Sequence, residues 1–379
     1  MSTATPNTTP TENPAINPAE VELARISPTR LMWLKFRDHR LAYLSLILLG
    51  LFYLIGAFCE FFSPADPWKR DVKYRYAPPQ TVRVFHDGKL HRPFVYPVVQ
   101  SVDEDTRRLS YAVDRERPLP IVLFPKGDPY KLWGLFSMER HLIGVSGDEP
   151  MFLLGADRLG RDLLSRIFYG SRISLSIGLS GVLLALVLGV VIGGISGYYG
   201  GRIDDYIQRV IEVLRSFPTI PLWLALSAAI PATVSDIMVY FCMTLILALI
   251  GWTGLARVVR GKFLALREED YILSAKVAGV PEMRIIRKHL VPAFTSYLIV
   301  HVTLAIPGMI LAETSLSFLK LGLRPPTISW GVLLQDAQNL TALTMYPWLL
   351  FPAAFVIVAV LAYNFVGDGL RDAADPYKN

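Results

Sequence analysis

The sequence predicts an all-α membrane protein with six transmembrane helices and a small, mainly β insert. Hydrophobic residues make up 52% of the 379 residues and charged residues only 18%, which is too little charge for a soluble protein of this length. A helix needs about 20 apolar residues to cross the hydrocarbon core. Six stretches meet or approach that length, at 41–61, 173–196, 206–230, 237–256, 297–312 and 347–366.

Two of these stretches need separate justification. The first follows 40 residues and lacks a small-x-small cleavage site, so we interpret it as an uncleaved anchor rather than a secretory signal. The third has charged residues in its first turns and prolines at 218 and 221, so the sequence does not fix its boundaries, nor those of the fifth. Residues 1–24, rich in Thr, Pro, Asn and Ala, predict a disordered tail.

Lysines and arginines in short connections predict the orientation. Five basic residues fall between 25 and 40, and residues 257–292 carry eight basic residues against four acidic ones. Both segments are therefore expected in the cytoplasm, with both termini inside and the long 62–172 connection outside. The predicted organisation is a cytoplasmic tail, a first transmembrane helix, a periplasmic insert and a five-helix core containing loop 257–292. Their bounds are 1–40, 41–62, 63–150 and 151–379.

The insert is predicted to contain short strands. Asp87-Gly88 favours a type I′ hairpin turn between Val84 and Leu90. Further extended segments are expected at 94–99 and 121–124. The insert is interpreted equally well as a structural cap or as a docking surface for a soluble partner outside the membrane.

Several functional classes are excluded by what the sequence lacks. Its two cysteines, Cys59 and Cys242, support neither a disulfide framework nor a thiolate metal site. No phosphate-binding loop, zinc-protease motif or nucleophile elbow occurs, so the chain is not expected to be an enzyme or to bind a cofactor or metal. The formal charge of +6 fits loops that face anionic lipid or an acidic partner rather than nucleic acid.

Three polar or glycine-rich clusters suggest structural roles. Four glycines near one face of the second stretch predict close helix packing, namely Gly189, Gly193, Gly194 and Gly197. Gly367-Asp368-Gly369 is predicted to end the last helix, with Arg371 near its negative end. Six charged residues are expected at the outer interface, paired among themselves: Asp157, Arg158, Arg161, Asp162, Arg166 and Arg172.

Polar residues inside the predicted spans are candidates for a pathway or gate, because burying them in hydrocarbon is costly. They are His301 on the fifth span, Glu313 at its outer end and Asn364 on the sixth. His301 is also compatible with a hydrogen bond between helices, and Glu313 with a helix cap.

The segment 269–292 combines small residues with a Gly-x-Pro interruption. It predicts a short helix ended by Gly279 and a second, basic helix over 282–289 after Pro281. Small residues allow another protein's surface to approach closely. The segment resembles the cytoplasmic signature loop of ABC importer permeases, although Leu273 stands where that class often has Glu. The matching positions are Leu273, Ser274, Ala275, Gly279, His289, Val291 and Pro292.

Three further segments resemble the dipeptide/oligopeptide/nickel class of these permeases, specifically its C-type subunit with an enlarged periplasmic insert. They lie at 154–175, 313–331 and 364–376 and contain Asp157-Arg158-Leu159-Gly160-Arg161-Asp162, Ser329-Trp330-Gly331 and Gly367-Asp368-Gly369. The resemblance covers about 150–379 and leaves the insert outside it.

This resemblance implies the type I permease fold and a permease subunit of the bacterial inner membrane that imports peptides or a related solute. Its implied partners are a second homologous permease, two cytoplasmic ATPases that bind ATP and Mg²⁺, and a periplasmic solute-binding protein. The residues expected to contact the ATPases are Ser274, Ala275, Lys276, Gly279, Val280 and Pro281. A self-sufficient ion-coupled carrier and a non-transporting sensor remain alternatives, and the sequence does not identify the solute.

Overall fold

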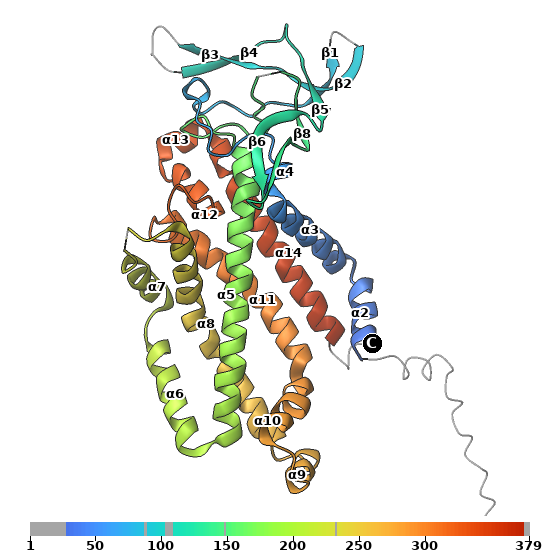
Figure 1. Cartoon of the computed structure of the whole chain (residues 1–379), viewed down its shortest axis with the longest axis vertical. Helices are drawn as coiled ribbons and strands as arrows, with labels where there is room; N and C mark the ends of the chain where they lie inside the picture. Colours follow the sequence, from blue (N-terminus) through green and yellow to red (C-terminus); the bar gives the residue numbers. More distant parts are fainter. Residues whose placement is uncertain (1–27, 87–88, 103–108, 148, 232, 375–379) are drawn as a thin grey trace, which may run out of the picture.

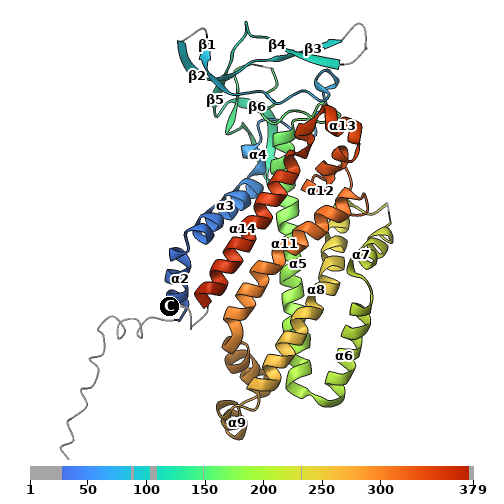
Figure 2. The same cartoon turned by 180° about the vertical axis from the view of Figure 1, so that it is seen from behind.

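A bundle of long helices carries a β domain at one end (Figure 1), and the view from behind shows the same arrangement (Figure 2). The computed structural model describes residues 28–86, 89–102, 109–147, 149–231 and 233–374. The predicted disordered tail, 1–24, lies outside the described residues. The β domain follows the first long helix, as predicted.

The helical elements keep the labels of Figure 1. They are α2 (Pro28–Asp38), α3 (Arg40–Ala57), α4 (Cys59–Phe62), α5 (Leu163–Tyr199), α6 (Gly201–Ser216), α7 (Thr219–Ala228), α8 (Asp236–Leu266), α9 (Asp270–Val277), α10 (Glu282–Ile285), α11 (Thr295–Phe318), α12 (Trp330–Leu333), α13 (Leu340–Met345) and α14 (Phe351–Ala374). In the described part of the chain, five helical segments are long and apolar enough to cross a membrane. The bent pair α6–α7 makes six if it counts as one span.

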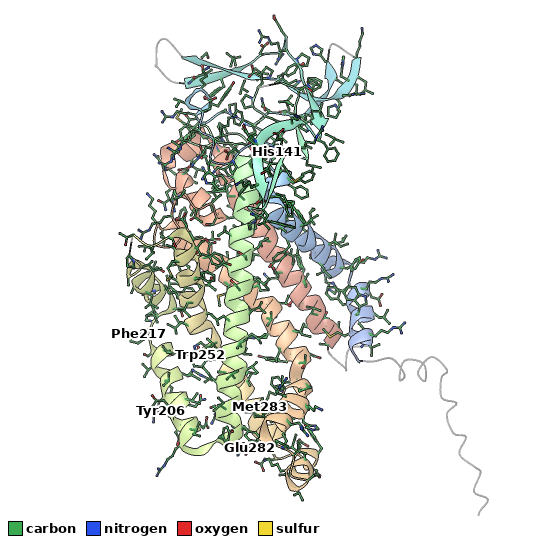
Figure 3. The ribbon with its side chains drawn as sticks, in the orientation of Figure 1. His141, Tyr206, Phe217, Trp252, Glu282 and Met283 are labelled. Atoms are coloured by element: carbon green, nitrogen blue, oxygen red, sulfur yellow. The ribbon has the colours of Figure 1, made fainter. Side chains whose placement is uncertain are left out.

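The third predicted span, 206–230, is not one straight helix. α6 and α7 meet at an angle of 85°. The backbone at Phe217 is extended, because a following proline disfavours the helical conformation and Pro218 has no amide hydrogen to continue the helix. Figure 3 labels Phe217 at this bend and Tyr206 on α6. Of the two helices, α7 is mainly apolar and α6 is amphipathic.

The second and fourth spans are longer than predicted. α5 has 37 residues and α8 has 31, or about 55 and 46 Å at 1.5 Å per residue, against a hydrocarbon core of about 30 Å. α5 begins at Leu163 rather than 173, because the Asp162 carboxylate caps it by accepting the Ser165 amide at 2.7 Å. α8 continues to Leu266, so residues 257–266 belong to this helix and not to a loop.

The glycines of α5 mediate its close packing against α8, as predicted. A Cβ placed on Gly193 would lie 2.8 Å from the Cα of Ala256, and one on Gly197 would lie 2.6 Å from the carbonyl oxygen of Arg260. The two helices therefore approach backbone to backbone, which only glycine permits at these positions.

The prediction that Gly367-Asp368-Gly369 ends the last helix is wrong, because α14 continues to Ala374. Both glycines are packing positions instead. A Cβ on Gly367 would clash with the Leu304 side chain of α11, and one on Gly369 would clash with Ala42 of α3. Arg371 does lie in the last turn, where its charge is favourable for the helix dipole.

The β domain consists of one four-stranded antiparallel sheet and two hairpins. The sheet has the order β1 (Arg83–His86), β2 (Lys89–Val95), β5 (Leu119–Leu123) and β8 (Ile143–Val145). The hairpins are β3 (Val98–Val102) with β4 (Leu109–Val113), and β6 (Lys126–Leu132) with β7 (Phe136–Arg140). The strands of the predicted hairpin pair as expected, with His86 opposite Lys89, while its turn residues 87–88 lie outside the described residues.

Candidate functional site

Residues 270–290 of the predicted coupling loop 257–292, called the coupling segment below, form two short helices at the end of the bundle opposite the β domain (Figure 1). α9 ends near Gly279, whose φ of +74° is a conformation that glycine adopts without strain. α10 begins directly after Pro281, as predicted, and passes into a π-helical turn over Ile286–Leu290.

An apolar cluster holds this segment against the long helices. Ile272, Ile285 and Leu290 are fully buried. They pack in one cluster with residues from α5, α8 and α11, namely Tyr198, Leu255, Val259, Phe263 and Leu298, and with Phe294. Because a fully packed interface cannot shift on one side alone, a displacement of α9 and α10 is transmitted to the ends of these helices.

The outer side of the coupling segment is exposed and partly apolar. Val277 is 89% exposed and Met283 is 64% exposed. Of the six residues predicted to contact ATPases, Ser274, Lys276, Gly279 and Pro281 are exposed, while Ala275 and Val280 are half-buried. The sequence interpretation missed Val277 and Met283, although apolar residues on either side of a Gly-x-Pro break in a basic segment were a usable signal.

Polar contacts also connect this segment to the end of α5. The Tyr199 hydroxyl donates to the Glu282 carboxylate at 3.0 Å. The Lys276 ammonium lies 5.5 Å from the centre of the Tyr198 ring. Figure 3 labels Glu282 and Met283 at this end of the molecule and His141 in the β domain at the other, with the buried Trp252 of α8 between them.

His301 lines a cavity of about 290 Å³ between helices. The cavity is otherwise mostly apolar and includes Trp223 of α7, Leu255 of α8 and Met309 of α11. The indole Nε1 of Trp223 is buried without a hydrogen-bond partner among the described residues. The structure thus places one predicted pathway candidate beside a polar donor and a space that a solute group could occupy.

Glu313 does not lie at the end of its helix, because α11 continues to Phe318. It is fully buried, and its carboxylate accepts hydrogen bonds from Ser174 of α5 at 3.0 Å and Ser317 at 2.8 Å. Ser174 in turn accepts the backbone amide of Trp330 at 3.1 Å. The contacts of Glu313 therefore join α5, α11 and α12.

Asn364, the third pathway candidate, is half-buried on α14 and is not among the residues that line the His301 cavity. Its neighbour Tyr363 shares a hydrogen bond of 2.5 Å with the hydroxyl of Tyr53 on α3.

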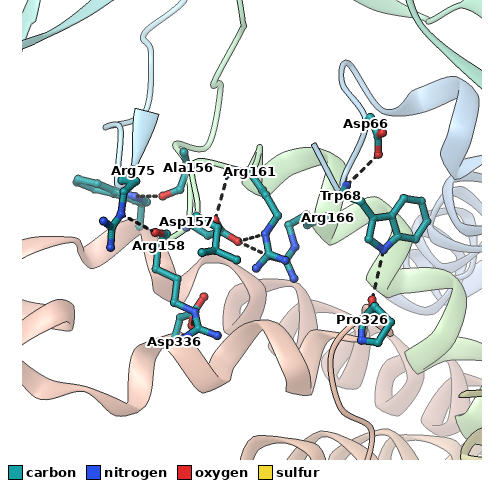
Figure 4. Close-up of polar contacts among 12 residues, drawn as sticks. Asp66, Trp68, Arg75, Ala156, Asp157, Arg158, Arg161, Arg166, Pro326 and Asp336 are labelled. Carbon is teal, nitrogen blue, oxygen red and sulfur yellow. Dashed lines mark hydrogen bonds and ion pairs between the residues drawn. The ribbon is translucent and has the colours of Figure 1, made fainter. Parts of the chain in front are cut away.

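An ion-pair cluster lies where the β domain meets the bundle (Figure 4). Asp157 forms ion pairs with Arg161 at 2.7 Å and with Arg166. Arg158 reaches Asp336, between α12 and α13, at 3.0 Å. The prediction that these charges pair among themselves holds for Asp157, whereas Arg158 uses a partner from a distant part of the chain.

The surroundings of Asp336 raise the pKa of its carboxyl. Burial raises the pKa of its carboxyl above the ordinary value, and the negative charge of Asp157 adds to the effect. The opposing attraction of Arg158 is smaller.

Two family models match the chain. Residues 189–378 match the binding-protein-dependent transport system inner membrane component, and residues 27–79 match the N-terminal transmembrane domain of oligopeptide transport permease C. The β strands lie between these two matched regions.

Curated relatives agree with these matches. The dipeptide transport system permease protein DppC of Bacillus subtilis is 42% identical over 223 residues, which are 59% of this chain and 68% of the relative. The oligopeptide transport system permease protein OppC of Haemophilus influenzae is 41% identical over 229 residues, or 60% and 71%. A solved structure of the inward-facing MetNI methionine ABC transporter aligns with 55% of this chain and 96% of that chain, at 19% identity and a TM-score of 0.42.

Proposed function

This chain belongs to the inner membrane components of binding-protein-dependent transport systems and is a permease of the peptide ABC importer type. From this premise we propose that it forms one half of a peptide pathway with a second permease and is driven by two ATPases bound at α9 and α10. A solute-binding protein on the β-domain side delivers the peptide. This assignment favours the importer over the self-sufficient carrier.

The observation that carries the coupling proposal is the two-sided character of the 270–290 segment. Its inner side is anchored by Ile272, Ile285 and Leu290, which are fully buried. Its outer side presents Val277 and Met283 to solvent on either side of the Gly279 turn, which gives a partner two apolar side chains to pack against. A partner that closes over Val277 and moves would therefore drag the ends of α5, α8 and α11 with it.

The orientation of the chain follows from the same segment. Residues 257–292 carry eight basic residues against four acidic ones, and basic connections are retained in the cytoplasm. We place α9 and α10 in the cytoplasm and the β domain in the periplasm. The described ends of the chain, α2 and the end of α14, lie toward the α9 end of the bundle (Figure 1), which supports our proposal that both ends of the chain are cytoplasmic.

Alternating access supplies the mechanism that fits this geometry. Closure of the ATPases moves the coupling segment, and the long helices then switch between outward and inward openings. The cavity beside His301 and Trp223 is the part of the described structure that we assign to the solute pathway.

The coupling proposal is tested with Gly279→Asp in the complete importer, reconstituted in vesicles with the binding protein and ATP. A Cβ at Gly279 meets no atom within 4 Å, so the new side chain has room. We expect at least a ten-fold loss of ATP-dependent peptide uptake, because the carboxylate occupies the surface that the ATPase must approach. Membrane insertion, measured by the yield of monodisperse chain, should be unchanged.

Gly201→Asp is the matched control. Gly201 also has a positive φ, of +55°, and a Cβ added there meets open space, but it lies at the start of α6, outside the coupling segment. It therefore reproduces the backbone strain without blocking α9. Normal uptake by Gly279→Asp, or an equal loss in both variants, refutes the coupling role.

A further inference from the structure

The tip of the β6–β7 hairpin is an exposed apolar turn. Its five residues, Leu132-Trp133-Gly134-Leu135-Phe136, contain no charged or polar side chain apart from the indole N–H. Trp133 is 51% exposed, Leu135 75% and Phe136 59%. Apart from Gly134, the turn lacks the Asn, Asp and Ser residues that a water-facing turn between two strands normally carries.

The turn is held at the end of the first transmembrane helix. The indole N–H of Trp133 donates to the carbonyl oxygen of Ala57 at 2.7 Å. The Trp133 ring also packs on Phe58, with 5.1 Å between the ring centres. Ala57 is the last residue of α3, and Figure 1 shows β6 running from the β domain down to this point beside α4.

The surface of α3 that leads to the turn is itself apolar and exposed. Leu44, Ile47, Leu51 and Leu54 are all exposed large hydrophobic residues on this 18-residue span. A membrane helix presents such residues to acyl chains. Because Ala57 directly follows this surface, the hairpin tip lies at the depth where the hydrocarbon core gives way to headgroups.

The backbone of the turn keeps its side chains projecting outward. Trp133 and Gly134 have φ values of +52° and +74°, and the Leu135 amide donates to the Leu132 carbonyl oxygen at 3.0 Å. Two consecutive positive φ values are typical of a type I′ turn, and a bulky residue adopts such a conformation only when its surroundings fix it. The bond to Ala57 provides that constraint for Trp133.

We propose that this hairpin tip inserts into the bilayer leaflet on the β-domain side and binds the lipid boundary between headgroups and acyl chains. Tryptophan is enriched at that depth because its ring is apolar and its N–H is polar. Leu135 and Phe136 enter the acyl region, and Lys131 on β6 is close enough in sequence to meet lipid phosphates. The inference requires only that the chain spans a membrane and does not depend on the proposed coupling role.

The test uses nitroxide spin labels on the full chain in phosphatidylcholine–phosphatidylglycerol vesicles, after Cys59 and Cys242 are replaced by alanine. Leu135→Cys reports on the tip. Leu90→Cys is the control, because Leu90 is 74% exposed and lies on β2 in the sheet, outside the β6–β7 hairpin. We expect the ratio of oxygen to nickel-chelate accessibility to be several-fold higher at position 135 than at position 90. Equal ratios would show that the tip lies in water, and low accessibility to both reagents would show that a protein covers it. Either result overturns the proposal.

A second measurement does not depend on labelling the tip. Phospholipids brominated near the headgroup end of their chains should quench part of the intrinsic tryptophan fluorescence, and Trp133→Phe should remove a measurable share of that quenching. Bromines placed deeper in the chain should show a smaller difference between the two proteins. If Trp133→Phe leaves the quenching by every brominated lipid unchanged, Trp133 does not contact the bilayer.

Discussion

Arg172 ties the β-domain end of α5 to the end of the first span, and its replacement is the sharpest stability test that the structure offers. Its guanidinium donates to the carbonyl oxygens of Gly56 and Ala57, each at 2.8 Å. It also donates to both carboxylate oxygens of Glu60, at 2.8 and 2.6 Å. Four acceptors converge on one side chain, which only the planar fork of arginine can satisfy together.

The cost of removing this side chain follows from burial. The Glu60 side chain is only 7% exposed and Arg172 is 32% exposed. Breaking a buried ion pair by removing one partner costs about 3–5 kcal/mol of stability. Because Arg172 is partly solvated, we expect Arg172→Met to lower the free energy of unfolding by about 3 kcal/mol. With roughly 2 °C per kcal/mol for a large chain, the unfolding temperature should fall by about 6 °C.

The assay is thermal unfolding of the purified chain in detergent at pH 7.5, followed by tryptophan fluorescence. Arg117→Met serves as the control, because Arg117 is 77% exposed and its pair with Asp114 is worth about 0–1 kcal/mol. Arg172→Lys should lie between wild type and Arg172→Met, since an ammonium keeps the charge but not the fork. If Arg172→Met shifts the unfolding temperature no more than Arg117→Met, the four-acceptor anchor does not stabilise the fold.

The same anchor should depend on pH. Burial is the largest single effect and raises the pKa of Glu60, but the hydrogen bonds and positive charge of Arg172, together with backbone hydrogen bonds, outweigh it and hold this pKa below its ordinary value of 4.5. A carboxyl whose pKa is lowered by folding contributes stability that is complete above its unfolded pKa and is lost as the pH falls through the folded value. The difference between wild type and Arg172→Met should therefore shrink below pH 4.5.

Two further predictions concern α5. Gly193→Val should reduce the yield of folded chain, because overpacking costs about 1–3 kcal/mol or more where a Cβ meets the backbone of Ala256. The control Gly50→Val should leave the yield unchanged, because a Cβ at Gly50 meets open space. Similar yields of the two variants would contradict backbone contact between α5 and α8. Burial raises the pKa of Asp162 to about 6, above the ordinary 3.8, so its contribution to stability is complete below pH 3.8 and is lost as the pH rises through 6. Asp162→Asn should therefore be more stable than wild type at pH 7.5, by up to about 3 kcal/mol at 1.36 kcal/mol per pKa unit, and unfolding measured from pH 7.5 to 5 should show that advantage narrowing.

Much of the bundle was predictable because each span is a continuous local run of mostly apolar residues. Five of the six predicted spans coincide with long apolar helices, and the third is the bent pair α6–α7. The bend at Phe217 and Pro218 has a local cause, whereas the wrong end predicted for the last helix results from contacts with distant segments. Gly367 and Gly369 look like a helix stop, but they stay helical because α14 packs through them against Leu304 and Ala42.

The candidate site was predictable to a similar degree. Gly279 and Pro281 correctly predicted the break between α9 and α10, since both residues interrupt a helix through their own backbone. The surroundings of Glu313 were not predictable, because Ser174 is 139 residues away in sequence. The role of the six coupling residues stays a prediction until the Gly279→Asp experiment is done.

The length of α5 has a mechanical consequence. One end of this helix carries Arg166 and Arg172 at the β-domain junction, and the other carries Tyr198 and Tyr199 against the coupling segment. If α5, about 55 Å long, tilts as a rigid rod by about 5° around one end, its other end moves by about 5 Å. Transmission of movement through α5 therefore depends on the stiffness of the helix as well as on the contacts at its two ends. A proline introduced in the middle of α5 would interrupt this helix and let its two ends move independently of each other.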